Sequence, residues 1–434
     1  MSTLRTPTDD WVELDRRHVW HPYTQMLTAA PPIPVDRGEG LYLVTPDGRR
    51  ILDGISSWWV NIHGHSHPRI NQALAEQAAT LEHVIFAGFA HEPAARLAGS
   101  LVERCGGRLP RVFYSDDGST AVEVALKMAY QYWRHLGEEQ RTLFIALDDA
   151  YHGDTVGTMA VGGTAVFHAA FRDLLFEVRR VATPSSEGRP GCGESLEEVL
   201  EREGQRVAAV LVEPMLQGAG GMLVQPVEFL QQIRQLTLDH GIPLIADEIF
   251  TGFGRTGKFL ACEHAGVTPD LLCLSKALTG GYLPLAATLA TDTIYQAFLS
   301  RDRGRTFFHG HSFTGNTLAC AVANASLELF EENRCLDRIA ELEVLFGERL
   351  ARLAELSVVE TTRCLGGMAA LDLAPTGDGG YLDTLGPRLS AAFLERDILL
   401  RPLGNTLYFL PPYIVTDDEA HRVFDAIDDV VGRL

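Results

Sequence analysis

The most restrictive feature of the sequence is an alternation, between about residues 68 and 280, of helical patterns with short apolar runs. Apolar residues recur at helical spacing in 68–81 and in 119–136. Runs this apolar, separated by helices, are typical of the strands of a parallel sheet that is covered on both faces. The sequence therefore predicts an α/β fold. The expected strands are RVFYS (111–115), LFIAL (143–147), VAAVLVEP (207–214), PLIADEI (243–249) and LLCLS (271–275).

The two ends of the chain follow other patterns. Near the N-terminus, LYLVTPDGRRILD (41–53) predicts a hairpin that turns at its Asp-Gly pair. Residues 185–205 begin as a Gly- and Pro-rich loop. After about residue 316 come long helices, short strands near 357–373 and a final amphipathic helix near 417–433. This last region predicts a smaller α+β unit.

Composition argues against several classes of protein. The 434 residues carry a net charge of −20, with 57 acidic and 37 basic side chains. That charge disfavours sequence-independent binding to nucleic acid or to an anionic lipid surface. The seven cysteines form no C-x-x-C pair, which is typical of reduced thiols in the cytoplasm. The first residues lack the apolar core of a signal peptide, and no apolar run approaches the roughly 20 residues of a membrane span. We therefore expect a cytoplasmic protein with no membrane partner.

One Gly-rich segment invites a nucleotide-binding interpretation. Residues 252–258, GFGRTGK, match the spacing of a phosphate-binding P-loop. A working P-loop needs Ser or Thr after the lysine to bind magnesium, and this chain has Phe259 there. Asp247 and Glu248 also end the preceding strand, where phosphates would have to approach. We therefore do not expect a nucleotide site here.

Chemically active residue types instead follow the expected strands. Residues 116–120, DDGST, open a helix after the first strand, and a helix N-terminus is a ready site for a phosphate. The other strands end near residues 151–154 (YHGD), Glu213, Asp247 and Lys276. In an open parallel sheet, ligands bind beyond the carboxyl ends of the strands. The sequence therefore predicts one cleft that collects an anion site, an aromatic ring, acids and a lysine.

This set of groups matches the needs of one cofactor. A lysine amine becomes nucleophilic where burial or a nearby charge lowers its pKa, and it can then form a Schiff base. A Schiff-base lysine, a carboxylate for the pyridine nitrogen and a phosphate anchor are the groups that pyridoxal phosphate requires. Lys276, Asp247 and the helix start at Gly118 and Ser119 would supply them.

From Leu244 to Gly281 the sequence resembles the signature of the class III pyridoxal-phosphate aminotransferases, and the resemblance extends over essentially the whole chain. It implies fold type I, with a mostly parallel, seven-stranded sheet in a large domain of residues 61–315. A smaller α+β domain would comprise residues 316–434, joined by the N-terminal segment 1–60. The resemblance also implies a homodimer with shared active sites. It is carried by WHPYTQM (20–26), SSWWVNIHGHSHP (56–68), HEPAARLA (91–98), DDGSTAVEVALKMAYQYW (116–133), AYHGDT (150–155), QGAGGM (217–222), DEIFTGFGRTG (247–257), SKALTGGYLPLAAT (275–288) and RPLGNTLYFLPPY (401–413).

The twin tryptophans and the N-terminal HPY are similar to those of the biotin-pathway members of this class. These members convert 8-amino-7-oxononanoate to 7,8-diaminononanoate, and their usual amino donor is S-adenosylmethionine. The resemblance therefore implies these small-molecule substrates and the cofactor pyridoxal 5'-phosphate. Lysine as the donor, or another class III reaction on ω-amino acids or diamines, stays open as an alternative.

The resemblance assigns roles around the cofactor. Lys276 would hold it and move protons, and Asp247 would pair with the pyridine nitrogen. Ile249 would pack on the ring face and Tyr151 would stack on the cofactor. The expected cofactor-binding residues are Gly118, Ser119, Tyr151, Glu213, Asp247, Ile249, Lys276, His311 and Ser312.

The substrate site is expected to be an aromatic surface with charged groups. Such a surface suits an aliphatic chain and attracts a sulfonium cation. Arg401 would bind a carboxylate, because a guanidinium grips carboxylates through two hydrogen bonds. Two adjacent tryptophans cannot both face one side of a strand, and the resemblance favours Trp58. The expected substrate-binding residues are Tyr23, Trp58, Trp59, Tyr151, Asp154, Arg255, Gly310 and Arg401, with Arg255 a substrate or a structural cation.

One segment departs from the family pattern, which often reads H-G-P-T-F where this chain has HGHSF (309–313). Ser312 still offers a hydroxyl to a phosphate, which we expect to be that of the neighbouring subunit. His311 replaces a proline near the amino-donor pocket and leaves the donor open. The spacing of His63, His65 and His67 is compatible with a metal, but the resemblance places them in a structural loop, so we expect no metal.

Overall fold

The computed structural model describes residues 9–186, 192–375 and 380–434. Residues 187–191, in the Gly- and Pro-rich loop expected at 185–205, lie outside the described part of the chain. Among the described residues, no helix combines the length and the apolar character that crossing a membrane requires. The α-helices are α1 (Asp9–His18), α2 (Ser56–Trp59), α3 (Pro68–Thr80), α4 (Glu92–Arg104), α5 (Gly118–Leu136), α6 (Val156–Val161), α7 (Ala165–His168), α8 (Leu196–Glu203), α9 (Val227–Asp239), α10 (Asp292–Gln296), α11 (Thr317–Glu332), α12 (Cys335–Leu353), α13 (Leu385–Leu394) and α14 (Asp417–Val431).

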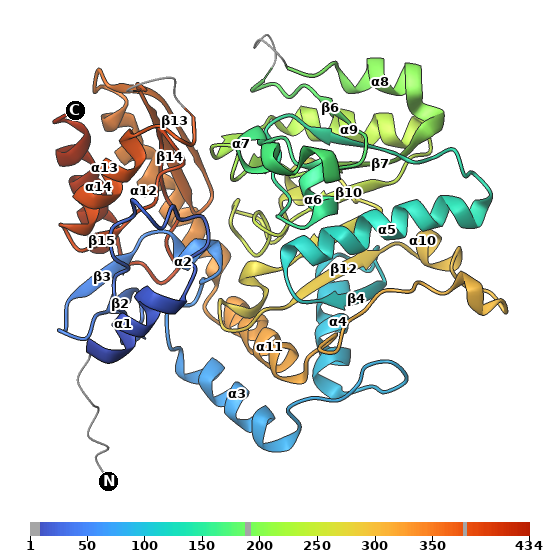
Figure 1. The fold of residues 1–434 in the computed structure, drawn as a ribbon, viewed down its shortest axis with the longest axis horizontal. Helices are drawn as coiled ribbons and strands as arrows, with labels where there is room; N and C mark the ends of the chain where they lie inside the picture. The colour runs from blue at the N-terminus through green and yellow to red at the C-terminus, as the bar shows by residue number, and fades with distance from the viewer. Residues whose placement is uncertain (1–8, 187–191, 376–379) are drawn as a thin grey trace.

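A seven-stranded sheet forms the centre of the larger part of the molecule (Figure 1), with the strand order β4-β12-β11-β10-β7-β5-β6. The predicted α/β fold with a mostly parallel sheet is confirmed. Only β12 runs against its neighbours, since it pairs antiparallel with both β11 and β4. The strands are β4 (Arg111–Ser115), β5 (Leu143–Leu147), β6 (Val178–Val181), β7 (Val207–Val212), β10 (Leu244–Asp247), β11 (Leu271–Leu274) and β12 (Ala286–Ala290).

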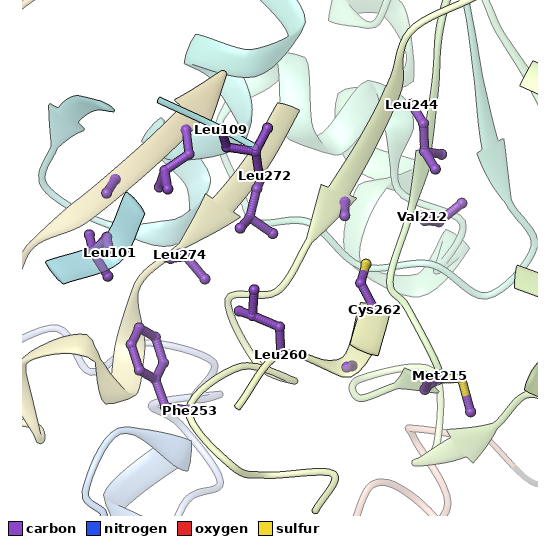
Figure 2. Close-up of a cluster of buried hydrophobic side chains, with 14 of the residues drawn as sticks. Leu101, Leu109, Val212, Met215, Leu244, Phe253, Leu260, Cys262, Leu272 and Leu274 are labelled. Atoms are coloured by element: carbon purple, nitrogen blue, oxygen red, sulfur yellow. The ribbon is translucent and has the colours of Figure 1, made fainter. Parts of the chain in front are cut away.

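The apolar strands are buried on both faces, as their composition predicts. In β5, Phe144 and Ala146 pack in the cluster that includes the apolar side of α5. Leu143, Ile145 and Leu147 alternate with them and point into the cluster on the opposite face. Figure 2 shows part of that second cluster, where side chains of β7, β10 and β11 meet.

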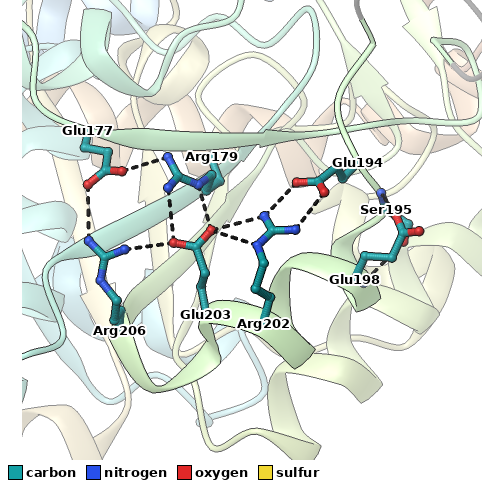
Figure 3. A network of polar contacts seen from close by, with 8 residues as sticks. All are labelled: Glu177, Arg179, Glu194, Ser195, Glu198, Arg202, Glu203 and Arg206. Atoms are coloured by element: carbon teal, nitrogen blue, oxygen red, sulfur yellow. Dashed lines mark hydrogen bonds and ion pairs between the residues drawn. The ribbon is translucent and has the colours of Figure 1, made fainter.

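The edge of this sheet at β6 carries a network of ion pairs (Figure 3). Glu203 of α8 lies at its centre and pairs with Arg179, Arg202 and Arg206 at 2.9, 3.1 and 2.8 Å. Charged side chains on an edge strand oppose its pairing with another chain. Glu177 and Glu194 complete the ion pairs of the network.

The two ends of the chain meet in the smaller part of the molecule (Figure 1). The predicted hairpin forms, as β2 (Tyr42–Val44) pairs antiparallel with β3 (Arg50–Asp53). β3 also pairs with β15 (Ile398–Leu399), so one sheet contains strands from both ends. A shared core adds α12, α13 and α14 to these strands. The remaining strands are β1 (Arg37–Glu39), β8 (Leu216–Gln217), β9 (Leu223–Val224), β13 (Val359–Leu365), β14 (Met368–Leu373) and β16 (Thr406–Phe409).

The long helices after residue 316, the strands near 357–373 and the final helix occur as α11, α12, β13, β14 and α14. The domain boundaries 1–60, 61–315 and 316–434 stay a prediction.

Candidate active site

A pocket of about 660 Å³ lies beyond the carboxyl ends of β4, β5, β7, β10 and β11. This is the edge at which an open α/β sheet is expected to bind its ligand. The structure therefore brings together residues that are far apart in the sequence. The expected site residues that line the pocket are Trp59, Gly118, Ser119, Tyr151, Asp154, Glu213, Asp247, Ile249 and Lys276.

Asp247 and His152 form a buried pair in this pocket. Nδ1 of His152 lies 2.7 Å from Oδ2 of Asp247, and Oδ1 accepts the backbone N–H of Ile249 at 3.0 Å. An ionised carboxylate only accepts hydrogen bonds, so Nδ1 of the histidine is the donor. The hydrogen bond therefore fixes both side chains at the end of β10, in the pocket that Glu213 and Lys276 also line.

Lys276 follows β11 and extends its amine toward two aromatic rings. Its Nζ lies 4.8 Å from the ring centroid of Trp59 and 5.6 Å from that of Phe250. Burial lowers the pKa of Lys276 to about 8, against the opposing effect of Asp247 and Glu213. A large fraction of this amine is therefore neutral near pH 8, which is the nucleophilic form.

Glu213, after β7, organises the backbone around the pocket. Its carboxylate accepts the N–H groups of Tyr151 and Gly218, each at 3.0 Å. Burial raises the pKa of Glu213 to about 7. The side chain thus ties the segment after β5 to the turn after β7.

The start of α5 is built to receive an anion. Asp117 caps the helix, and its side chain accepts the N–H of Thr120 at 2.9 Å. The N–H groups of Gly118 and Ser119 in the first turn have no partner within the helix. Only glycine fits at 118, because a Cβ there would lie 2.7 Å from Cγ2 of Ile249. The helix dipole and these free donors favour a phosphate at this end of the pocket.

On the outer side of the pocket, Tyr23, Tyr151 and Asp154 form a triangle of hydrogen bonds. The hydroxyls of Tyr23 and Tyr151 donate to Oδ2 of Asp154 at 2.5 and 3.0 Å, and they lie 3.1 Å from each other. Burial is the main reason that the pKa of each tyrosine is raised. Both phenols therefore stay protonated and leave Asp154 as the negative charge at this edge.

The twin tryptophans do not lie on a strand, so the expectation that they point to opposite faces of one was wrong. Residues 56–59 form a left-handed turn, with φ of 52°, 45°, 70° and 73°. Trp59 is buried, lines the pocket and donates from Nε1 to the hydroxyl of Tyr408 at 3.0 Å. Trp58 is 38% exposed, and its ring lies 5.5 Å from that of Tyr23. Both rings thus face the region of the site, at different depths.

Arg401 lies next to Trp58, outside the pocket itself. Its guanidinium carbon is 4.5 Å from the centroid of the Trp58 ring. In the described part of the chain, no carboxylate forms an ion pair with Arg401. The position leaves a free cation at the end of the aromatic surface.

Residues 24–431 match the family model of the class-III aminotransferases. The chain belongs to this family. It is 49% identical to an adenosylmethionine-8-amino-7-oxononanoate aminotransferase of Synechococcus elongatus over 96% of this chain and 99% of the relative. It is 44% identical to the protein of the same name from Geobacter sulfurreducens over 96% of each.

Solved structures agree with the assignment. The structure of the adenosylmethionine-8-amino-7-oxononanoate aminotransferase from Methanocaldococcus jannaschii superposes with a TM-score of 0.91, at 37% identity over 98% of each chain. A PLP-bound amine transaminase from an uncultivated Pseudomonas species gives 0.89, at 35% identity over 96% of this chain and 98% of that one.

In this aminotransferase, Arg255, which was expected to be either a substrate-binding or a structural cation, lies inside the protein. The side chain is fully buried and does not line the pocket. It donates to the backbone carbonyls of Trp59, Asn61 and Pro411 at 3.1, 3.2 and 3.3 Å. The burial and these three backbone contacts favour a structural role over the binding of a substrate carboxylate.

The HGHSF segment of the aminotransferase borders the pocket of its own chain through His311 but does not line it. Gly310, His311 and Ser312 are exposed and do not line it. Nε2 of His311 is 2.8 Å from Oδ1 of Asp116, and its Nδ1 accepts the N–H of Phe313 at 3.2 Å. The contacts of Ser312 and His311 with a cofactor of the neighbouring subunit stay a prediction.

The three histidines of the 56–68 segment have separate partners. Nε2 of His63 is 3.0 Å from the carbonyl oxygen of Ser326, and Nε2 of His65 is 3.0 Å from Oδ2 of Asp53. Within the described ranges, no cluster of residues could hold a metal ion.

Two kinds of site residue escaped the sequence analysis. His152 stands in the strand-end motif YHGD, which could have indicated it, because a polar ring at a strand end enters the same cleft. Phe167 and Tyr381 carried no signal, since they lie outside every recognised motif. Their rings are 4.7 Å apart, and Phe167 is also 5.6 Å from Tyr23 and 5.9 Å from Tyr151.

Proposed function

We propose that this aminotransferase transfers an amino group to the ketone of 8-amino-7-oxononanoate and forms 7,8-diaminononanoate for biotin synthesis. Its cofactor is pyridoxal 5'-phosphate and its amino donor is S-adenosylmethionine. The observation that carries the proposal is the placement of Lys276, of lowered pKa, in one pocket with the Asp247–His152 pair and the free N-terminus of α5. The near full-length similarity to relatives that bear this activity in their names supports the choice of substrates.

The residues of the pocket fit the cofactor. The phosphate is held by the N–H groups of Gly118 and Ser119, where a side chain at 118 is excluded by Ile249. Asp247 would pair with the pyridine nitrogen, and the hydrogen bond from His152 would hold that carboxylate in position. The bound cofactor supplies an aldehyde for the substrate amine and a ring that withdraws electrons from the substrate carbon.

The chain's own groups handle the protons. Nζ of Lys276 is the base that takes a proton from the substrate carbon and returns it, and its pKa of about 8 suits exchange near neutral pH. The rings of Trp59 and Phe250 cover this amine and limit the access of water. Asp154 attracts the substrate amine, since it is the charged member of its triangle with Tyr23 and Tyr151.

The outer residues suit both substrates. The carboxylate of the oxononanoate binds Arg401, whose guanidinium has no carboxylate partner in the described chain. Its aliphatic chain lies along Trp58 and Tyr23. The same rings attract the sulfonium group of S-adenosylmethionine through a cation–π interaction.

We also propose that the protein works as a cytoplasmic homodimer. Its seven cysteines are all free thiols. Large apolar side chains are exposed in two segments, residues 83–89 and 308–313. The rings of His83 and Phe313, 5.2 Å apart, show that the two segments lie side by side. A second copy of the chain would cover this apolar surface, and would bring Ser312 to its cofactor phosphate. The exposed side chains are Ile85, Phe89, Phe308 and Phe313.

The test separates the two half-reactions. S-adenosylmethionine, or lysine, is added to the purified holoenzyme without acceptor, and the visible absorption of the cofactor is followed. We expect bleaching by S-adenosylmethionine, and 7,8-diaminononanoate by mass spectrometry once the oxononanoate is added. Bleaching by lysine alone would show that the amino donor is lysine and not S-adenosylmethionine. Turnover with β-alanine, 4-aminobutyrate or putrescine, and none with the oxononanoate, would overturn the proposal. Lys276→Ala serves as the inactive control.

A further inference from the structure

Five side chains follow one another around the outer side of the pocket, and we call them the collar. Arg401 lies over Trp58 at 4.5 Å, and the rings of Trp58 and Tyr23 are 5.5 Å apart. Tyr23 is 5.6 Å from Phe167, and Phe167 meets Tyr381 edge-on at 4.7 Å. The collar therefore joins the N-terminal segment, α2, α7 and two C-terminal loops.

The two ends of this series are joined through the backbone. A Cβ on Gly404, three residues after Arg401, would lie 2.0 Å from the carbonyl oxygen of Gly380 and 3.0 Å from the N of Tyr381. The loop that carries Tyr381 thus packs directly on the loop that carries Arg401. The N–H of Asp383 donates to the Gly380 carbonyl at 3.0 Å and closes a turn around Tyr381. The contacts consequently form a closed circuit.

Tyr381 also lies close enough to Tyr23 and Tyr408 to influence both phenols electrostatically. Burial chiefly raises the pKa values of Tyr23 and Tyr408, and the nearby Tyr381 raises each of them further. Tyr23 reaches the pocket edge through Asp154, and Tyr408 lies behind Trp59, whose Nε1 donates to it. Tyr381 is therefore near two residues that adjoin the pocket.

The collar stands directly over the pocket. Tyr151 lines the pocket, its ring is 5.9 Å from Phe167 and its hydroxyl is 3.1 Å from that of Tyr23. A substrate whose reacting carbon lies near Lys276 must extend outward past these rings. The collar consists of four aromatic rings and the cation of Arg401, so it suits an unbranched aliphatic chain that ends in a carboxylate.

We propose that Tyr381 determines the substrate specificity of this site, by closing the collar against Phe167 and so restricting entry to slender chains. The inference rests on the proposed function for the identity of the acceptor. The aromatic ring of Tyr381 makes the contact with Phe167, and the hydroxyl is not required for it.

The test compares Tyr381→Ala with Tyr381→Phe and with a control, Leu382→Ala, at a neighbouring side chain that is 75% exposed. Loss of the ring removes an apolar contact with the acceptor, and we expect its KM to rise about tenfold with little change in kcat. Tyr381→Phe and Leu382→Ala should retain the KM of the unmodified enzyme. Quenching of tryptophan fluorescence by the acceptor gives its Kd independently of turnover, and should follow the same order.

A bulky probe tests the opening of the collar. 1-Phenylethylamine should bleach the cofactor about tenfold faster in Tyr381→Ala than in the unmodified enzyme, because a branched aromatic amine passes only an open collar. Phe167→Ala should have the same effect, and the double variant should add little, since both remove one contact. Unchanged acceptor KM and unchanged reaction with this amine in Tyr381→Ala would overturn the inference.

The two hypotheses fail separately. Absence of turnover of 8-amino-7-oxononanoate by the unmodified enzyme would refute the proposed function. The role of Tyr381 in the collar would still be tested by the reaction of the variants with 1-phenylethylamine, because that reaction needs only the amine half-reaction. Retention of cofactor absorption and melting temperature in Tyr381→Ala establishes that the variant is folded.

Discussion

The left-handed turn at residues 56–59 is stabilised by a buried carboxylate, Asp53, and replacing it should both destabilise the protein and weaken acceptor binding. Asp53 is completely buried. It accepts the N–H groups of Ile55 and Ser57 at 3.2 and 2.9 Å, the Ser57 hydroxyl at 2.7 Å and Nε2 of His65 at 3.0 Å. Although burial raises it, these hydrogen bonds hold the pKa of Asp53 below its usual value.

The size of the effect follows from the turn itself. A left-handed conformation costs an L-residue about 1–2 kcal/mol, so the four residues of the turn cost about 4–8 kcal/mol together. Hydrogen bonds to a charged group contribute about 1.5–3 kcal/mol each and offset this cost. Asp53→Ala leaves buried donors without an acceptor, and we expect the free energy of unfolding to fall by about 3–5 kcal/mol. Asp53→Asn keeps one acceptor oxygen and should lose about half as much.

Urea unfolding followed by tryptophan fluorescence measures the stability, and steady-state kinetics measures the site. Because the turn carries Trp58 and Trp59, both variants should raise the KM of the acceptor. Asp372→Asn is the control, since this carboxylate pairs with Arg363 at 2.7 Å, away from the turn. It should lower stability without changing KM. An unfolding free energy of Asp53→Ala within about 0.5 kcal/mol of the unmodified protein would refute the reasoning.

Three further outcomes are expected. Arg255→Met removes the donor of three buried carbonyls, so the free energy of unfolding should fall by about 3 kcal/mol or more. The acceptor KM should stay unchanged, and a raised KM at full stability would indicate that Arg255 binds substrate. The amine of Lys276 reacts only when neutral, so its labelling in the cofactor-free protein should rise with pH around a midpoint of about 8, and a midpoint near 10.5 would contradict the lowered pKa. Arg401→Leu should raise the KM of the carboxylate-bearing acceptor roughly 10- to 100-fold, measured at saturating donor, and an unchanged KM would remove Arg401 from the site.

Sequence patterns were sufficient to predict the sheet and the residues that meet in the inner pocket. The runs 143–147 and 207–212 are apolar at every position, and such a run is stable only with both faces covered. Parallel strands place their carboxyl ends at one edge, so Glu213, Asp247 and Lys276 had to meet there. Phe259 was likewise enough to reject a nucleotide site, because magnesium needs an oxygen ligand at that position.

The outer part of the site was decided by tertiary structure alone. Arg255 stands in a Gly-rich segment, yet it is buried because two distant segments, at residues 59–61 and at Pro411, pack their carbonyls around it. The turn at Trp58 and Trp59 is stabilised by Asp53, which accepts the N–H groups of Ile55 and Ser57, and by contacts with distant residues such as Arg255 and Tyr408, none of which local propensity predicts. Phe167 and Tyr381 meet only when α7 and a C-terminal loop pack together. The periodicity of apolar residues indicates which face of a helix or strand is buried. The pairing of side chains from remote segments depends instead on how the helices and strands pack together. In this protein, that packing shapes the entrance to the site.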